Sequence, residues 1–568
     1  MAEGTDTANL AKIEHVVVLM LENRSFDHML GYLSLEGGRG DVDGLRAEFA
    51  NTYDGHRYPV HHLGTTAIAD DPDHSADAVD LQLGGGAMDG FVASFAKTLA
   101  DRGVPGHDAS AIMGYYTAAD IPVYDHLARE FAICDRWFSS VPGATWPNRL
   151  YAICGRAAGS RDDLPPHVPP TYRQPSFVRH LDAHGVSWRW YSFEAGTLRM
   201  ADAHYRLGHH HRFAFFSSEN LNWKERLELR IDAGSRSFLE DAAHGTLPAL
   251  SWIDPNFSNF NPIGFQPNDD HAPADIKDGQ EFALAVYHAL ASGPQWEKTL
   301  LIIFYDEHGG FFDHVPPPVA PDDNPQTFSR YGVRVPALIV SPWFEPGSVS
   351  HTLFDHTSII KTILLRFCPD ALSQSGRPHR RFARLNRGGR AQPVGTRAAQ
   401  AHNLGELLTR STPRPAPDRY ALIQGAAAHA AARPKGAAIK QDALPRQPPT
   451  DLQRRIAAAN KELRRLGHPA DLPLQNECSR RSARHRHAQV PDIHALDIHA
   501  LAGDRREAPY PKSRSGDYRS DSDPRLACPA SGQLVSILLP LALTTYHPAP
   551  NAVLPWPLAV PVPVSAVK

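Results

Sequence analysis

Several short apolar runs along the chain end abruptly in polar residues. The clearest are HVVVLML at His15 to Leu21, TLLIIFY at Thr299 to Tyr305 and ALIVS at Ala337 to Ser341. Uninterrupted apolar runs of this length are typical of strands that are buried on both faces, as in a parallel sheet. We expect two further strands at Val186 to Phe193 and at Ala249 to Ile253, where aromatic and β-branched residues gather.

Segments with helical spacing lie between these runs. Ile121 to Phe131 has a proline in its first turn and apolar residues on one face. A second helix is expected to begin at Pro147 and to end near Gly155. A third follows a polar loop that opens at Asn268, and a fourth spans Phe354 to Leu364.

The apolar periodicity fades in the last third of the chain. With 568 residues the chain is long enough for two or more domains, and its 42% hydrophobic content is ordinary for a globular protein. We expect one folded domain over residues 1–370, a linker rich in Ala, Arg and Pro over 371–449, and a poorly ordered tail over 450–568. A capping box at Thr450 to Gln453 predicts one helix in that tail, over 451–466.

Charge and targeting features argue against several classes of protein. The formal net charge is -4, so no overall basic field indicates nucleic-acid binding. No segment approaches the roughly 20 apolar residues that a membrane-spanning helix needs. The first residues, MAEGTDTANLAK, lack the basic region of an export signal, so we expect a cytoplasmic protein. The five cysteines include no CxxC pair and indicate no disulfide framework, and the pattern specifies no oligomeric state.

Oxygen-donor side chains directly follow two of the expected strands. Glu22 and Asn23 come after the first strand, and Asp306 and Glu307 follow Tyr305. Open α/β sheets bind ligands beyond the carboxyl ends of their strands. Carboxylate and amide oxygens suit a divalent cation and the phosphate that it would neutralise. A solvated turn is the alternative at Glu22, whereas metal ligation is the favoured reading at Asp306 and Glu307.

The hydroxyl of Thr145 lies at the start of an expected helix. Thr145 lies at or just before the N-cap of the helix that is expected to begin at Pro147. Free backbone N–H groups and the positive end of the helix dipole favour a bound phosphate there and help to stabilise an alkoxide. A simple helix cap is the alternative reading of Thr145.

Histidines from the loops complete the candidate set. His271 lies in the polar loop before the third helix, with a solvated loop histidine as the alternative. Asn51 to Gly114 is rich in His, Asp and Gly and indicates a long surface excursion. We interpret its histidines, His74 among them, as solvated rather than metal-binding. His314 and His356 either support the site from behind or have structural roles.

Together these groups point to metal-assisted phosphoryl transfer. The motifs ENRSFDHMLGYL, GATWPNRLYAICG and FYDEHGGFFDHVPPP, with the histidine loops between them, resemble a known family. It is the bacterial phosphoesterase family of phosphatidylcholine-type phospholipases C and related acid phosphatases, within the alkaline-phosphatase-like superfamily. The resemblance covers about Ile13 to Pro369.

The resemblance implies a doubly wound, mostly parallel α/β sheet flanked by helices, with residues 1–370 as the catalytic domain. It assigns a divalent metal ion to Glu22, Asn23, Asp306 and Glu307, with Thr145 as a nucleophile that contacts the same ion.

Two histidines are also assigned by the resemblance. Phosphate binding, together with Asn23, and leaving-group protonation go to His271 and, by aromatic register, to His210. The family motif around that second histidine commonly reads like KHNPFAYF, whereas this chain has HHHRFAFF, so His209 and His211 remain alternatives to His210.

The expected activity is hydrolysis of phosphodiester bonds in phospholipids. Thr145 would attack phosphorus, and water would then cleave the phosphothreonine. Hydrolysis of small phosphomonoesters by the same groups, as in an acid phosphatase, is the first alternative. A metal-stabilised binding protein without turnover is the second. Many relatives in this family are exported, so a secreted or periplasmic location is the alternative to the cytoplasm.

Overall fold

The computed structural model describes most of the first two thirds of the chain and one later helix. The described residues are 2–163, 172–217, 231, 234–257, 267–372, 391–417 and 451–466. All of them fall within one compact unit, Met1–Val490.

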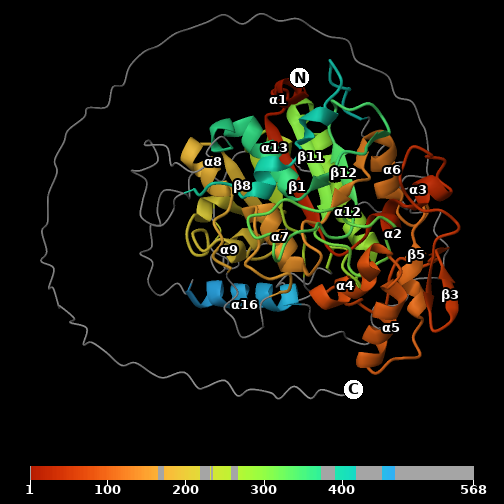
Figure 1. Ribbon diagram of the computed structural model, residues 1–568. Coiled ribbons are helices and arrows are strands. Elements are labelled where there is room, and N and C mark those ends of the chain that lie inside the picture. The colour runs from red at the N-terminus through yellow and green to blue at the C-terminus, as the bar shows by residue number, and fades with distance from the viewer. Residues whose placement is uncertain are drawn as a thin grey trace, which may run out of the picture. The chain divides into compact units, whose positions relative to one another are not determined.

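An eight-stranded sheet forms the centre of this unit (Figure 1). Its order is β13 (Ser348–Ser350), β6 (Ala132–Cys134), β12 (Ala337–Val340), β11 (Thr299–Tyr305), β1 (His15–Leu21), β10 (Leu250–Ile253), β8 (Trp188–Ser192) and β9 (Phe213–Phe215). Strand β12 is antiparallel to both of its neighbours, and the other pairs are parallel. The expected mostly parallel α/β sheet is therefore confirmed.

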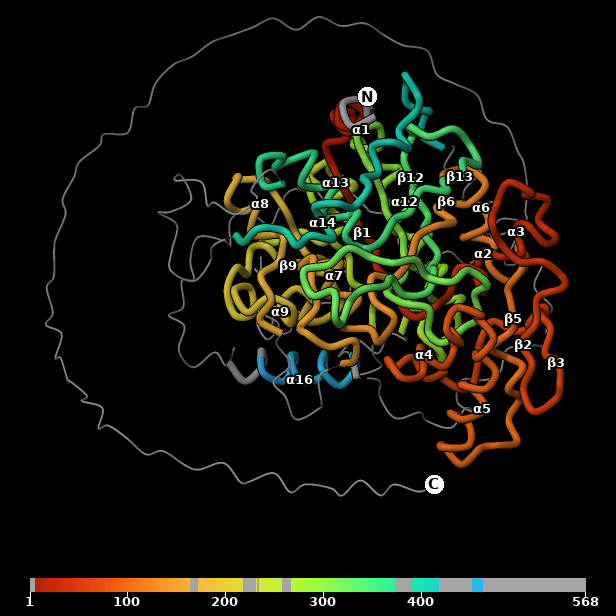
Figure 2. The backbone as a smooth tube through the Cα atoms, viewed as in Figure 1, coloured from red at the N-terminus to blue at the C-terminus, as the bar shows by residue number. Residues whose placement is uncertain are grey.

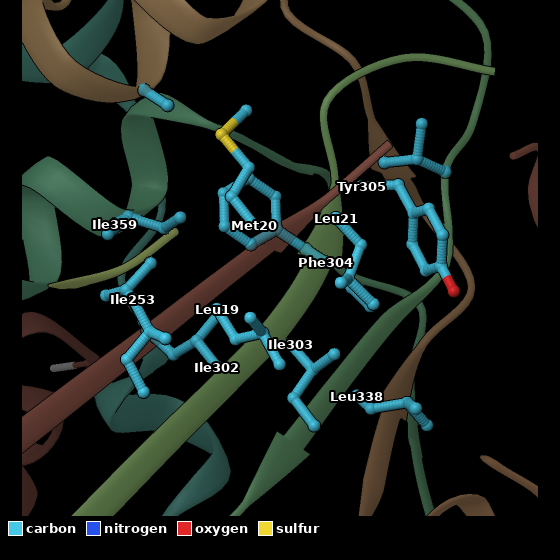
Figure 3. Close-up of a cluster of buried hydrophobic side chains, with 14 of the residues drawn as sticks. Leu19, Met20, Leu21, Ile253, Ile302, Ile303, Phe304, Tyr305, Leu338 and Ile359 are labelled. Carbon is cyan, nitrogen blue, oxygen red and sulfur yellow. The ribbon is translucent and has the colours of Figure 1, made fainter. Parts of the chain in front are cut away.

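The register of the central strands places two chain segments at one edge. β1 pairs with β11 along its whole length, from His15 opposite Thr299 to Leu21 opposite Tyr305. Both strands are almost entirely buried, as their uninterrupted apolar sequences predict. Figure 3 shows Leu19 and Met20 among the side chains of β11. The residues that follow Leu21 and Tyr305 therefore leave the sheet side by side.

Helices flank this sheet. Helix α12 (Ile276–Ala291) packs against α6 (Pro122–Glu130) and α11 (Phe238–His244), and α7 (Thr145–Cys154) packs against α13 (Thr357–Phe367) and α9 (Thr197–Ala201). The shorter flanking elements include α1 (Ala2–Leu10), α2 (Phe26–Leu30), α3 (Tyr32–Leu35), α8 (Val178–His184), β7 (Trp137–Phe138) and β14 (Phe354–Asp355).

Two of the expected helix starts are shifted. Helix α7 begins at Thr145, with Ala144 as its N-cap, rather than at Pro147. The expected helix from Phe354 begins only at Thr357, because Phe354 and Asp355 pair with β7 as strand β14.

The segment between residues 50 and 115 is more ordered than its sequence indicated. It contains a hairpin of β2 (Ala50–Tyr53) and β3 (His56–Pro59), the helices α4 (Ala76–Leu83) and α5 (Phe91–Asp101), and the pair β4 (His61–His62) and β5 (Gly114–Tyr115). In Figure 2 these elements gather on one side of the unit, in red and orange. The surface-excursion reading was wrong because Val79, Phe91 and Phe95 give the helices a buried face.

Part of the expected linker packs onto the domain. In residues 391–417, which include α14 (Thr396–Gln400), Ala398, Leu404 and Leu408 are buried. Arg397 lies 3.0 Å from a carboxylate oxygen of Asp322. The linker reading therefore does not hold for 391–417. Residues 373–390, 418–450 and 467–568, on which the rest of the linker and tail predictions fall, lie outside the described residues.

The predicted tail helix is present as α16 (Asp451–Leu466). Gln453 Nε2 donates to the carbonyl of Phe257 at 2.8 Å. The guanidinium of Arg455 lies 5.4 Å from the centroid of the Tyr172 ring, and Glu462 pairs with Arg206. Helix α16 therefore packs on the domain that contains the sheet.

Candidate active site

The polar residues after β1 and β11 lie together at the carboxyl edge of the sheet. The backbone N–H of Asn23 donates to Oδ1 of Asp306 at 3.0 Å, and the N–H of Glu307 donates to the same oxygen at 2.8 Å. Glu22, Asn23, Asp306 and Glu307 are all buried. The structure therefore brings these four predicted residues together.

The backbone is tightly packed at this edge. Asn23 has φ 58°, a left-handed conformation that asparagine tolerates better than most residues. Gly309 has φ 63°, and a Cβ at this position would lie 2.2 Å from the carbonyl oxygen of Asn23. Glycine at 309 thus permits the turn after β11 to pass directly over Asn23.

Three buried oxygens of this group make no hydrogen bond to any described residue. They are Oδ1 of Asn23, Oδ2 of Asp306 and Oε1 of Glu307. In the two carboxylates the other oxygen is held, since Oδ1 of Asp306 accepts the two N–H groups above and Oε2 of Glu307 accepts from Gly309 N at 2.7 Å. Burial and the nearby charge of Glu22 raise the pKa of Asp306 well above its ordinary value. Unsatisfied buried oxygens of this kind fit a divalent cation.

Glu22 is engaged differently from its three neighbours. Its Oε1 accepts from Arg149 Nε at 2.8 Å and from Arg149 Nη2 at 2.5 Å, and its Oε2 lies 3.1 Å from Nδ1 of His271. Burial raises the pKa of Glu22, but Arg149 and His271 outweigh it, so the pKa lies below its ordinary value. Glu22 therefore orients two cationic side chains at the site.

Arg149 is a site residue that the sequence analysis missed. It is fully buried on α7, its Nε lies 3.5 Å from Oδ2 of Asp306, and its guanidinium lies 4.9 Å from the centroid of the Phe257 ring. The available signal was its spacing, because residues four apart on a helix share one face. Arg149 follows Thr145 by four positions.

Thr145 is the first residue of α7 and is almost completely buried, with 3% of its surface exposed. Its side chain makes no hydrogen bond to another described residue. Since it lies one turn before Arg149 on the same helix, it is on the side of α7 that faces Glu22. The next residue, Trp146, donates its backbone N–H to Asp163 at 2.9 Å.

Two histidines face the amide of Asn23. Its Nδ2 lies 3.1 Å from Nε2 of His271 and 3.2 Å from Nε2 of His74. Oδ1 of Asp71 lies 3.1 Å from Nε2 of His271, and ligand atoms of Asp71, His74 and His271 lie within 4.8 Å of one another. His271 is therefore in the predicted place, whereas the solvated interpretation of His74 was wrong.

Neighbouring carboxylates raise the pKa of both histidines. Burial lowers the pKa of His271, but Asp71 and Glu22 outweigh it and raise the pKa well above its ordinary value. For His74 the carboxylates of Glu307 and Asp71 likewise outweigh burial and raise the pKa. Two imidazoles with a raised pKa next to oxygen donors that fit a cation suit a phosphate group.

The glycines after Glu307 explain how His74 reaches the site. Gly310 has φ 77°, and a Cβ there would lie 2.8 Å from Pro72 and 3.1 Å from the carbonyl oxygen of Asp73. Gln82 on α4 donates to the same carbonyl at 2.8 Å. The Gly-Gly turn and the start of α4 thus hold the loop that carries Asp71 and His74.

His210 lies elsewhere. It occupies a short 3-10 turn, His210–Arg212, that leads into the amino end of β9. Strands β9, β8, β10 and β1 are neighbours in this order and all run in the same direction. The amino end of β9 therefore lies at the opposite edge of the sheet from Glu22, which follows the carboxyl end of β1. The structure does not bring His210, or its neighbours His209 and His211, to the other site residues.

His356 and His314 have different surroundings in the structure. Nε2 of His356 lies 2.6 Å from the carbonyl oxygen of Asp306, and burial lowers the pKa of His356 to about 3. It therefore supports the site from behind as a neutral group. His314 lies instead beside Asp27, at 2.6 Å from its Oδ2.

Comparison with known proteins identifies the family of the chain. The model of the phosphoesterase family matches residues 13–368. The chain belongs to the phosphoesterase family. The expectation from the motifs is thereby confirmed, and the chain is a phosphoesterase of the hydrolase class.

The relatives of this phosphoesterase are named phospholipases C. The chain is 34% identical over 370 residues to non-specific phospholipase C6 of Arabidopsis thaliana, covering 62% of this chain and 67% of that protein. It is 30% identical over 410 residues to phospholipase C B of Mycobacterium tuberculosis, covering 64% of this chain and 75% of that protein. Among solved structures, it resembles a protein in the alkaline phosphatase superfamily from Vibrio parahaemolyticus, with a TM-score of 0.29 and 11% identity over 64% of this chain and 75% of that chain.

Proposed function

We propose that this phosphoesterase hydrolyses phosphodiester bonds of phospholipids, in the manner of a phospholipase C, with a divalent metal ion and Thr145 as nucleophile. The observation that carries the proposal is the set of three unsatisfied buried oxygens on Asn23, Asp306 and Glu307 beside two histidines, His74 and His271, whose pKa is raised. A bound cation would satisfy the unpaired oxygens, and the phosphate group of a substrate would accept hydrogen bonds from the histidines.

Asn23, Asp306 and Glu307 would hold the metal ion. When bound, such an ion supplies positive charge that lowers the pKa of a nearby hydroxyl and stabilises charge on phosphoryl oxygens. Glu22 would act indirectly, because its carboxylate keeps Arg149 and His271 in place.

Thr145 would attack phosphorus from the start of α7. Its hydroxyl has no hydrogen bond to a described residue that it would need to break, and the helix dipole favours an alkoxide at this position. Arg149, on the same side of the helix, adds a fixed positive charge close to the reacting group.

His74 and His271 would take the roles first assigned to His271 and His210. Both have a raised pKa and both adjoin the amide of Asn23, so one could bind an equatorial phosphoryl oxygen while the other protonates the departing alcohol. Water would then cleave the phosphothreonine.

The diester preference rests on the names of the relatives. The phosphoryl group is held by Asn23, Arg149 and the histidines whichever alcohol leaves, so phosphomonoester hydrolysis uses the same groups. Among the described residues no helix is both long and apolar enough to cross a bilayer.

Steady-state hydrolysis of nitrophenyl phosphorylcholine and of nitrophenyl phosphate tests the proposal. With metal-loaded wild type we expect turnover of the diester, lost on chelation and lost by a factor of about 10³ or more in Thr145→Ala. Thr145→Ser is the matched control, since it retains a hydroxyl and should keep measurable turnover.

Three other outcomes of this assay would change the proposal. A preference for the monoester would move the assignment to phosphatase. Full activity of Thr145→Ala would exclude Thr145 as the nucleophile. Absence of turnover of both substrates by the metal-loaded wild type would contradict catalysis of these substrates and favour a binding role.

A further inference from the structure

A second group of metal-ligating side chains lies far from the proposed active site. It consists of Asp182 on α8, His204 in the loop after α9 and His209 just before β9. One ligand atom from each residue lies within 4.8 Å of the others. We propose that these three residues bind a transition-metal ion of the zinc class.

The carboxylate of Asp182 is already oriented. Its Oδ1 accepts from the indole Nε1 of Trp188 at 2.8 Å, and its Oδ2 accepts from the hydroxyl of Tyr205 at 2.7 Å. Hydrogen bonds of this kind commonly hold metal-binding carboxylates in place. The remaining lone pairs of both oxygens can still coordinate an ion.

The two imidazoles converge on this carboxylate. Their ring centroids lie 4.6 Å apart, and His209 also contacts the Tyr205 ring at 5.0 Å. Nδ1 of His209 is buried and makes no hydrogen bond to any described residue. A buried nitrogen without a partner is costly unless a ligand satisfies it.

The surrounding charges permit a cation. Nη2 of Arg212 lies 3.4 Å from Oδ1 of Asp182, but the same guanidinium also donates to the carbonyl of Trp188 at 3.3 Å and lies 5.1 Å from the centroid of its ring. Arg212 therefore keeps contacts if an ion takes its place at Asp182. The guanidinium of Arg179, which also acts on His204, is paired with Asp202 at 2.5 Å.

The donor set selects the class of metal. Two imidazole nitrogens and one carboxylate oxygen suit Zn²⁺ and similar ions, whereas Mg²⁺ and Ca²⁺ prefer oxygen ligands. A bound ion would connect α8 to the segment that leads into β9. The proposal is independent of the proposed hydrolysis, because these residues lie at the other edge of the sheet from Glu22.

Zinc titration of the full chain tests this site. We would use the double variant Asp306→Asn, His271→Gln as the background after chelation, so that neither Asp306 nor the group of Asp71, His74 and His271 contributes, and follow binding by calorimetry and by the visible absorption of Co²⁺. The background chain should bind one ion tightly. His209→Gln, and separately His204→Gln, should each weaken binding by a factor of about 10 or more.

His211→Gln is the matched control, because His211 belongs to the same histidine run, is exposed and is not one of the three ligands. Its affinity for zinc should equal that of the background chain. Circular dichroism of each variant checks that the fold is retained. Equal weakening by His209→Gln and His211→Gln, or unchanged binding in folded His209→Gln and His204→Gln, would overturn the proposal.

Discussion

Arg149 and Arg334 are both fully buried, and each lies among carboxylates and a histidine. Their hydrogen bonding differs. Arg334 donates from Nε to Asp313 at 2.9 Å and from Nη2 to Asp27 at 3.0 Å. Its Nη1 donates to the carbonyls of Asp43 and Asp135 at 2.7 and 2.8 Å. No side-chain atom of this network is both buried and without a hydrogen bond among the described residues.

The network of Arg149 is incomplete by comparison. Its Nη1 has no hydrogen bond to a described residue, and neither has Oδ2 of Asp306 or Oε1 of Glu307. Asp27, Asp313 and His314 also have the spacing of metal ligands, but Arg334 already occupies their centre. Residue types and spacing are thus similar in the two places, and hydrogen-bond completeness distinguishes a structural network from a site that receives a ligand.

The largest expected effect comes from Asp306→Asn. Turnover of the proposed substrate should fall by a factor of about 10³ or more, since one metal-binding oxygen loses its charge. The free energy of unfolding in chelator should change by less than about 1 kcal/mol, because a buried carboxylate with a raised pKa contributes little stability. Initial rates and urea unfolding measure the two quantities. A variant with near wild-type turnover would contradict the functional reading of this network.

Arg334→Met should have the opposite profile. Removing the guanidinium leaves Asp27 and Asp313 buried without their cation, so the free energy of unfolding should fall by about 3–5 kcal/mol. Turnover per folded molecule, measured well below the unfolding temperature, should stay close to that of wild type. A folded variant of unchanged stability would show that the network is not structural.

Binding of the catalytic cation gives the next effect. At a concentration about 100 times its Kd, the cation that supports turnover should stabilise wild type by about 2.7 kcal/mol relative to chelator. Asp306→Asn should lose this increment, whereas Arg334→Met should retain it if enough protein folds. Thermal unfolding with and without the ion measures it. An equal increment in Asp306→Asn would place the ion elsewhere.

The smallest effect is a pH dependence in the complete network. Asp27 and Asp43 outweigh burial and raise the pKa of His314 to about 9. The protonated form therefore stabilises the fold fully below an unfolded-state pKa of about 6.5, and this contribution is lost as the pH rises through about 9. His314→Gln should cost about 1–2 kcal/mol at pH 6 and less at pH 9.5. Urea unfolding at both values measures the difference, and a constant difference would contradict it.

The central strands and the polar residues directly after them could be predicted from the sequence. The runs at His15 and Thr299 are apolar at almost every position, which is typical of strands with both faces buried. In a parallel sheet the residues after these two runs are expected at the same edge, so Glu22 and Asp306 could be assigned to one site from the sequence. The direct pairing of β1 with β11 could not be predicted, because it joins segments far apart in the chain.

The remaining site depends on contacts between distant segments. Asp71 and His74 lie in a polar loop without ligand spacing, and they reach His271, about two hundred residues away, only because α4 and the Gly-Gly turn hold that loop. The sequence indicated only that Arg149 shares a helix face with Thr145, and not that it contacts Glu22. His210 was assigned by aromatic register alone, which says nothing about the edge of the sheet at which a strand begins.

Helix α16 has a consequence for the synthesis of this protein. It holds the carbonyl of Phe257, whose ring lies against Arg149, and Arg455 lies over Tyr172, whose ring contacts Trp146 at 5.0 Å. Two residues of α7, Trp146 and Arg149, therefore gain indirect support from a segment that leaves the ribosome long after the sheet residues. A nascent chain that has emerged only as far as residue 417 contains every proposed active-site group but not this support, so we expect the site to reach its final rigidity only late in translation.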